Sequence, residues 1–324
     1  MNIKVVNKPE QDKRLMRDVL ADCFYNFAET RPNVIYLDAD LISSLGMSKF
    51  HKDHPDKVIQ CGIQEANMIG VAGGLSAVGF IPFTHTFGAF AARRVADQVF
   101  LSVAYAGNEV KMIGSDPGIT AATNGGTHTA FEDISIMRAI PKIRIVEPTD
   151  TVMLGNLLPK IADSPGPFYI RLTRKEVMKI YEEGSDFEIG KSAQLREGSD
   201  LTLIGSGLTV AECLRAHDIL REKNISARII DMYTIKPVDV DSIVKAAKET
   251  GAILTAENHN IHGGLGSAVA ETLVENFPVP MQRVGSADEF GEVGPVSYLK
   301  QRFGLTGENI AQEAEKLLRR KQRI

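Results

Sequence analysis

The stretch DPGITAATNGGTH, from Asp116 to His128, has an acid at its start and an imidazole at its end. It joins the apolar, strand-like EVKMIGS to the helical pattern TAFEDISIMRAI, and it is longer than most such connections. Loops held by a rigid scaffold often carry functional side chains, so His128 is a candidate catalytic or binding residue. A purely structural, hydrogen-bonding role for this histidine is the common alternative.

Glu65 is a second candidate, because in CGIQEANMIGVAGGLSAVG it lies where a predicted strand gives way to a predicted helix. A carboxylate is favoured there by the positive end of the helix dipole. The helix also contains Gly70, Gly73 and Gly74, each costing up to about 1 kcal/mol relative to alanine, which indicates close packing against it. These residues alone support a helix-stabilising role and a chemical role for Glu65 equally.

Aromatic residues and glycine turns are weaker signals. Phe87 and Phe90 in THTFGAFAARRVADQV share one face of a helix, a spacing that is more typical of a core than of a ligand platform.

The turns GSG (205–207) and HGGLGSA (262–268) join strands to helices, where backbone N–H groups can bind phosphate. The full dinucleotide fingerprint is missing from both, so tight structural turns are the favoured interpretation.

The elements that must position these residues alternate between short apolar runs and longer helical patterns. The runs are NVIYLDAD, KVIQCG, GFIPFTH, EVKMIGS, KIRIVEP, PFYIRLT, LTLIGSG, ISARIIDM, GAILTAEN and VPMQRVG. The helical patterns include FAARRVADQVFLSVAYAG and TDTVMLGNLLPKIAD. This alternation predicts an α/β fold with two three-layer α/β domains, each a mainly parallel sheet flanked by helices. The polar segment 174–200 is interpreted as a linker with one short hairpin, which places the domains at 1–180 and 190–324.

Composition narrows the class of protein. The 324 residues are 44% hydrophobic and 24% charged, with a net charge of −4, which is ordinary for a soluble globular protein and gives no indication of nucleic-acid binding. The cysteines at 23, 61 and 213 form no CxxC pair, which argues against a disulfide scaffold or a zinc site and predicts a cytoplasmic protein. No run approaches the roughly 18 apolar residues of a membrane span, so no membrane partner is expected.

Taken in order, these motifs resemble the transketolase family. Gly62-Ile63-Gln64-Glu65 with Met68 is similar to the family's GI-x-E-x-x-M segment, and the segment around Phe87 is similar to its aromatic segment. GGTHTAFEDISIMRAIPKIRIVEPTD, IRLTR, IDMYTIKPVD and TAENHNIHGGLGSAVAE match later parts of the family. No GDG metal motif occurs. The resemblance therefore implies the C-terminal subunit of a split transketolase, with a pyrimidine-binding domain (1–180) and a transketolase C-terminal domain (190–324).

The resemblance also implies a cofactor, thiamine diphosphate, whose pyrimidine ring would lie against this chain. Glu65 would hydrogen-bond a pyrimidine nitrogen, and Phe90 would stack on the ring. The residues expected around the cofactor are Glu65, Phe87, Phe90, Asp40 and Ile63. Mg²⁺ and its ligands would belong to an N-terminal partner subunit that carries the pyrophosphate-binding domain, in a homodimer or heterotetramer.

Substrate contacts follow from the same resemblance, with sugar phosphates as the expected ligands. His128 matches a histidine that contacts a substrate hydroxyl and moves protons, and Arg174 matches an arginine that binds a sugar phosphate. Asp116 stands where the family has a histidine and Asn124 where it has an aspartate, and both family residues contact sugar hydroxyls. Those hydroxyls belong to the sugar acceptor, so the changes predict altered selectivity and favour ketol transfer that uses a non-standard sugar or a modified acceptor.

Three alternatives remain open from the sequence. Two are related thiamine enzymes, 1-deoxy-xylulose-5-phosphate synthase and the beta subunit of a 2-oxo acid dehydrogenase, although GGTH and TIKPVD are more similar to transketolase. The third is a catalytically silent α/β regulatory protein, against which Glu65, Phe90 and His128 argue together.

Overall fold

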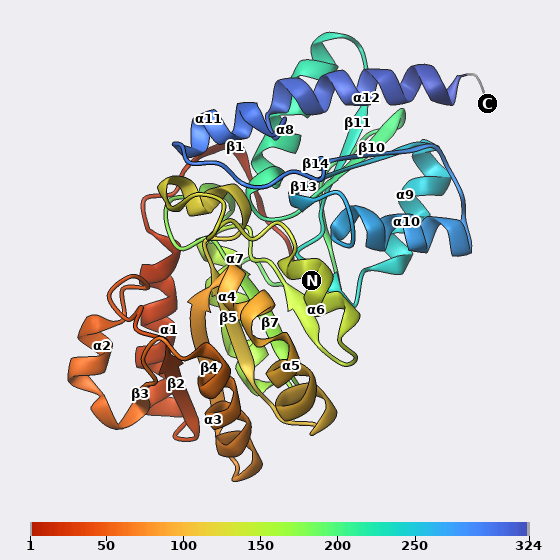
Figure 1. Ribbon diagram of the computed structural model, residues 1–324. Helices are drawn as coiled ribbons and strands as arrows, with labels where there is room; N and C mark the ends of the chain where they lie inside the picture. The colour runs from red at the N-terminus through yellow and green to blue at the C-terminus, as the bar shows by residue number, and fades with distance from the viewer. Residues whose placement is uncertain (1, 323–324) are drawn as a thin grey trace.

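Two large sheets, each covered by helices on both faces, form the body of the protein in a computed structural model that describes residues 2–322 (Figure 1). The first sheet has seven strands and is parallel except where its edge strand β12 pairs with β6. In sheet order its strands are β12 (Thr234–Lys236), β6 (Arg144–Val146), β7 (Phe168–Leu172), β5 (Lys111–Ser115), β4 (Ile81–Phe87), β2 (Val34–Asp38) and β3 (Val58–Gln60). The predicted parallel α/β architecture is confirmed for this half.

The apolar runs form buried strands because alternate side chains point into two cores. In β2, Val34 and Tyr36 pack on one side of the sheet, whereas Ile35 and Leu37 pack on the other. The helices that pack on the Val34 side of this sheet are α1 (Met16–Thr30), α2 (Ser48–Asp53) and α7 (Thr151–Asp163), and the same core continues into the second half of the chain. The helices of the second core are α3 (Glu65–Ala77), α4 (Gly88–Ala92) and α6 (Asp133–Ala139).

The segment after β4 is not the single helix that its sequence predicts. It consists of α4, a 3₁₀ turn η2 (Arg93–Val95), a short helix α5 (Ala96–Gln98) and a π-helix η3 (Val99–Tyr105). The backbone at Ala92 (φ −113°, ψ −72°) departs from regular helical geometry where the 3₁₀ turn begins. Such breaks in hydrogen-bond register often occur at functional sites, and this one contains the consecutive residues Arg93 and Arg94.

The second sheet has five strands, parallel except for its edge strand β9. In order they are β14 (Met281–Ser286), β13 (Ile253–Asn260), β10 (Leu201–Gly205), β11 (Ala227–Asp231) and β9 (Ala193–Arg196). Helices α8 (Leu208–Glu222) and α12 (Gly307–Lys321) cover one face, and α9 (Val240–Thr250) and α10 (Leu265–Asn276) the other (Figure 1). The short helix α11 (Val296–Arg302) precedes α12.

The segment between the two sheets contains two strands, but the hairpin predicted there is wrong. Strand β8 (Met178–Tyr181) pairs with β1 (Val5–Gln11), and β9 joins the second sheet beside β11. Both strands pair with distant parts of the chain, which local sequence does not reveal. Strand β12 likewise reaches from the second half into the first sheet, so the two halves are interlocked.

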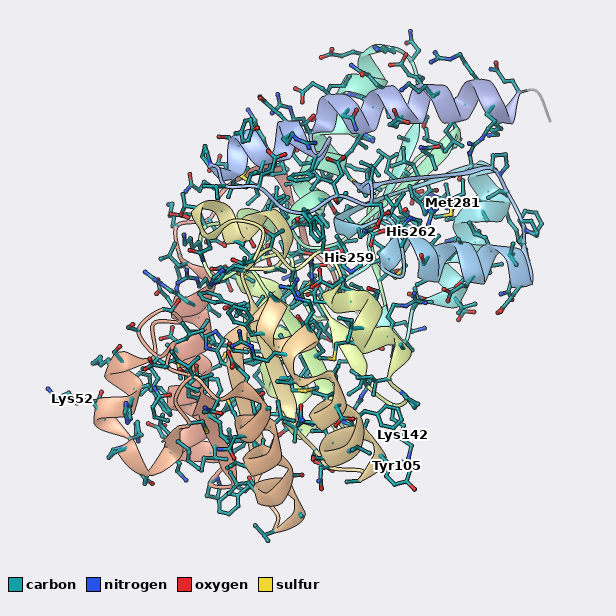
Figure 2. The ribbon with its side chains drawn as sticks, viewed as in Figure 1. Lys52, Tyr105, Lys142, His259, His262 and Met281 are labelled. Atoms are coloured by element: carbon teal, nitrogen blue, oxygen red, sulfur yellow. The ribbon has the colours of Figure 1, made fainter. Side chains whose placement is uncertain are left out.

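A buried charge network joins the two sheets. Arg171 on β7 is fully buried and donates from Nε to Asp133 Oδ2 at 2.9 Å and from Nη1 to Glu147 Oε1 at 2.6 Å. Its Nη2 donates to the backbone oxygen of Asn258 on β13 at 2.6 Å. His259, the next residue of β13, lies where the second half meets the first (Figure 2), with its Nε2 3.9 Å from Asp133 Oδ1, and burial lowers its pKa to about 4. These contacts fix the second sheet against the carboxyl edge of the first.

Candidate active site

The predicted site residues follow strands of the first sheet at its carboxyl edge. In sheet order, β7, β5, β4, β2 and β3 end before or at Arg174, Asp116, Phe87, Asp40 and Glu65. Parallel strands deliver the residues at their carboxyl ends to one edge, where ligands of open α/β sheets bind. The sequence therefore identified candidates that the fold collects in one place.

Glu65 is the first residue of α3 and is only 3% exposed. Its two carboxylate oxygens accept hydrogen bonds from Nη1 of Arg94 at 2.7 and 2.8 Å, and Thr86 Oγ1 lies 3.5 Å from Oε1. Sequence reasoning missed Arg94. A signal was present, because Arg94 lies four residues after Phe90 and a helix would bring these two side chains together.

Three rings form a cluster beside Glu65. His128 meets Phe87 and Phe90 edge-on, with ring centroids 5.6 and 5.1 Å apart, and the two phenylalanines lie 6.3 Å from each other. The guanidinium carbon of Arg94 lies 4.0 Å from the centroid of the Phe90 ring. The face of Phe90 is therefore in contact with a flat, nitrogen-bearing group that also binds a buried carboxylate.

Asp116 and Arg174, both predicted to bind substrate, form an ion pair. Arg174 donates from Nε to Asp116 Oδ2 at 2.6 Å and from Nη1 to the backbone oxygen of Ser44 at 2.8 Å. Within residues 2–322, Asp116 Oδ1 is buried and has no hydrogen-bond partner. Burial raises the pKa of Asp116, and the charge of Arg174 opposes that rise. Arg174 also lies 5.6 Å from the Phe87 ring centroid, which links this pair to the aromatic cluster.

The loop 116–128 is held by the second half of the chain. Gly118 has φ +53°, and a Cβ there would lie 2.1 Å from the side-chain oxygen of Asn258. That oxygen accepts from Ile119 N at 2.9 Å, while the Asn258 amide donates to the oxygen of Pro117 at 2.9 Å. Asn258 was missed by sequence reasoning, since no local pattern shows that β13 reaches this loop.

The remaining predicted residues lie at the exposed rim. Ile63 is 68% exposed beside Glu65, and Asn124 is exposed at the end of η4 (Gly118–Asn124). Asp40 is exposed and its backbone has a left-handed conformation (φ +66°). Its N–H donates to Gln60 Oε1 at 2.8 Å. Of the predicted site residues, six are linked by ring contacts, an ion pair or a shared contact with Arg94, and three lie at the rim. The six are Glu65, Phe87, Phe90, Asp116, His128 and Arg174.

The two glycine turns of the second half are occupied by the chain's own carboxylates. A Cβ at Gly207 would lie 2.6 Å from Glu147 Oε1. Glu257 accepts hydrogen bonds from the N–H groups of Leu265 at 2.7 Å and Gly266 at 2.9 Å. These contacts support the structural interpretation of both turns, because a carboxylate stands where a phosphate would bind.

The described part of the chain has neither a metal-binding cluster nor a helix that could span a membrane. Residues 2–322 contain no group of three histidine, cysteine, aspartate or glutamate side chains that could hold a metal ion. Within the same range, no helix has both the length and the hydropathy needed to cross a bilayer.

Comparison with known proteins gives one consistent family. The family model "Transketolase, pyrimidine binding domain" matches residues 12–179, and "Transketolase, C-terminal domain" matches residues 190–310. The chain is 48% identical to a 6-deoxy-6-sulfo-D-fructose transketolase subunit, SqwH, of Clostridium sp. (strain MSTE9), over 96% of each chain. It is 37% identical to an apulose-4-phosphate transketolase subunit of Phocaeicola vulgatus, covering 92% of this chain and 96% of that relative.

A solved structure agrees with these sequence matches. The structure described as "Split gene transketolase, inactive beta4 tetramer" superposes with a TM-score of 0.88 and is 37% identical, covering 95% of this chain and 99% of that one. Enzymes of the matched family generally use thiamine diphosphate and a divalent metal ion. The chain belongs to the transketolase family, as a transferase subunit of the split type.

Proposed function

We propose that this chain supplies the pyrimidine side of a thiamine diphosphate site in a two-subunit transketolase. The carrying observation is the arrangement of Glu65, a buried carboxylate at a helix start, beside the ring of Phe90, whose face contacts the half-exposed guanidinium of Arg94. In this proposal residues 1–180 bind the pyrimidine ring, and residues 190–324 form the C-terminal domain. That domain holds the loop 116–128, called the substrate loop below.

The residues present fit an aminopyrimidine ring. Such a ring needs a carboxyl group for its nitrogen and an aromatic face for stacking. The guanidinium of Arg94, itself a flat nitrogen-bearing group, already contacts both Glu65 and Phe90. Exposed Ile63 adds apolar surface next to the same carboxylate.

The roles of the side chains follow from their positions. When bound, thiamine diphosphate supplies the nucleophilic carbon and the electron sink. Glu65 holds a proton at the pyrimidine nitrogen, and Phe87 and Phe90 orient the ring. His128, which reaches the cluster from the substrate loop, moves protons at a sugar hydroxyl. Asp40 contributes at the rim near the cofactor.

The partner in this proposal is an N-terminal subunit that holds the diphosphate group and Mg²⁺. A solved relative, 99% of which this chain covers, is described as an inactive beta4 tetramer, which fits a site that this kind of chain does not complete alone. The active assembly is then a heterotetramer of two chains of each kind.

The proposed ketose is 6-deoxy-6-sulfo-D-fructose, the sugar in the name of the 48% identical relative. Asp116 lies 2.6 Å from Arg174 and offsets its positive charge, which weakens the attraction for a dianionic phosphate more than for a singly charged sulfonate. The unpartnered Asp116 Oδ1 accepts a sugar hydroxyl, with Asn124 at the same loop. Apulose 4-phosphate is the second candidate, from the Phocaeicola vulgatus relative.

A donor panel tests this function. The chain is assembled with an N-terminal transketolase subunit, and kcat/KM is measured for 6-deoxy-6-sulfo-D-fructose, apulose 4-phosphate and xylulose 5-phosphate with common aldose acceptors. We expect the sulfosugar to lead by at least about tenfold, the scale expected from one unpaired polar contact. Full activity on xylulose 5-phosphate plus ribose 5-phosphate contradicts the non-standard sugar, and activity of the chain alone contradicts the shared site.

A further inference from the structure

Arg94 occupies the two groups that the proposed cofactor ring would use. We propose that its guanidinium is a placeholder, meaning that it fills the aminopyrimidine position in the cofactor-free subunit and leaves when thiamine diphosphate binds. This inference rests on the proposed function and adds to it a residue that controls access to the site.

The geometry of Arg94 imitates that of the ring. Its Nη1 lies 2.7 and 2.8 Å from the two oxygens of Glu65, while its Cζ lies 4.0 Å from the centroid of Phe90. A guanidinium is planar and donates hydrogen bonds from its edge while it stacks with its face. An aminopyrimidine between the same two residues would offer the same kinds of contact.

Glu65 needs such a substitute while the site is empty. Its carboxylate is 3% exposed, and Thr86, at 3.5 Å, is its one other side-chain hydrogen-bond partner found in residues 2–322. A buried charge left without partners is costly. Arg94 therefore keeps the carboxylate satisfied before the cofactor arrives.

Arg94 is free to leave, in contrast to its neighbour. Its side chain is 44% exposed, and the contacts described for it are with the side chains of Glu65 and Phe90. Arg93 instead donates from Nη2 to the backbone oxygen of Thr127 at 3.0 Å and pairs with Glu132 at 3.0 Å. The 3₁₀ turn thus assigns one arginine to the substrate loop and the other to the carboxylate.

Displacement of Arg94 lowers the affinity for thiamine diphosphate, because part of the binding free energy goes into breaking its contacts. The apparent affinity falls by the fraction of subunits in which the site is open. Removing the guanidinium should therefore tighten cofactor binding, the opposite of what loss of a supporting contact would do.

The test measures the binding of thiamine diphosphate with Mg²⁺ to the assembled two-subunit enzyme by calorimetry. Wild type is compared with Arg94→Ala and Arg94→Lys, which keeps the charge but cannot stack as a plane. Arg215→Ala is the matched control, since Arg215 pairs with Glu308 on the surface of the second half. We expect Arg94→Ala to lower the Kd by about 3- to 30-fold, Arg94→Lys to lower it less, and the control to leave it unchanged.

A second readout does not depend on turnover. The rise in melting temperature on adding cofactor should be larger in Arg94→Ala than in wild type, because the cofactor then fills an empty place. Equal or weaker binding by both Arg94 variants, with wild type still binding, overturns the placeholder and makes Arg94 a support of the bound state. If neither wild type nor the variants bind, the proposed function itself fails.

Discussion

Glu65 and Glu257 are buried residues whose carboxylates both lie at the start of a helix, yet their hydrogen-bond partners differ. Glu257 on β13 is fully buried and accepts from two backbone N–H groups at the start of α10. Glu65 begins α3 and is bound by side chains, chiefly the half-exposed Arg94. Backbone donors are fixed by the helix, whereas a long exposed side chain can move away.

Under the proposed function, this difference distinguishes a structural carboxylate, Glu257, from a chemical one, Glu65. Around Glu257, the glycines 264 and 266 leave room for the carboxylate alone, because a Cβ at either would lie 2.0 or 2.9 Å from it. Around Glu65, an aromatic face and exposed Ile63 leave a half-open setting. Burial and position at a helix start are the same in both cases, so the two carboxylates differ in their partners, which are backbone N–H groups at Glu257 and a half-exposed side chain at Glu65.

The largest expected effect comes from removing the acid at Glu65. In Glu65→Gln we expect kcat to fall by about 10²- to 10⁴-fold, because the amide cannot exchange a proton with the cofactor ring. The far-ultraviolet circular dichroism spectrum should be unchanged. The matched variant Glu257→Gln should keep kcat within about threefold while changing stability, since it lies outside the reacting groups. Comparable losses of kcat in the two variants would remove the distinction between the carboxylates.

Asp116 is a third buried carboxylate and sharpens the comparison, because one of its oxygens is unpartnered within residues 2–322. Asp116→Asn keeps the shape but releases Arg174 from its ion pair. We expect kcat/KM for a sulfosugar donor to fall by about 10- to 100-fold, the effect of losing a charge-assisted contact, while the relative rate with phosphorylated donors rises. A uniform loss across all donors, measured on the same panel, would contradict a role in selectivity.

Wild type and Glu257→Gln should also differ in how their unfolding free energy depends on pH. Burial raises the pKa of Glu257 to about 7 from 4.5, so the fold favours its neutral form. Its stabilising contribution is complete below about pH 4.5 and is lost as the pH rises through about 7. From pH 5 to pH 8 the unfolding free energy of wild type should fall by about 2 kcal/mol relative to Glu257→Gln. Urea denaturation at both pH values measures this, and a constant difference would argue that Glu257 stays ionised.

Much of the first sheet could be predicted from the sequence, because its central strands are short, fully buried runs of mainly apolar residues, such as β2 and β7. Strands β1, β8, β9 and β12 could not, since they are half-exposed or very short and pair with distant segments. Their place depends on where the two halves meet, which no local pattern encodes.

The candidate site residues were proposed from the sequence one by one but not as pairs. Glu65, Asp116 and Arg174 were identified from motifs, whereas the partner Arg94 lies 29 residues from Glu65 and Arg174 lies 58 residues from Asp116. The glycine turns were correctly given a structural interpretation, although the carboxylates that fill them were not foreseen. Motifs indicate candidate side chains one at a time, whereas the ion pairs between them depend on which strands and loops the fold brings together.

The smallest expected effect concerns Phe90, whose ring face distinguishes the setting of Glu65 from that of Glu257. Phe90→Leu keeps an apolar side chain but removes the flat surface, so Arg94 and the cofactor ring lose the same stacking contact. Aromatic stacking contributes about 0.5–1.5 kcal/mol, and the Kd of thiamine diphosphate should rise by about two- to tenfold. In the background of Arg94→Ala the same substitution should raise the Kd more, because no competing guanidinium is weakened along with the cofactor. Calorimetry on the four combinations gives the coupling between the two positions, and strictly additive effects would show that the guanidinium and the ring use different faces of Phe90.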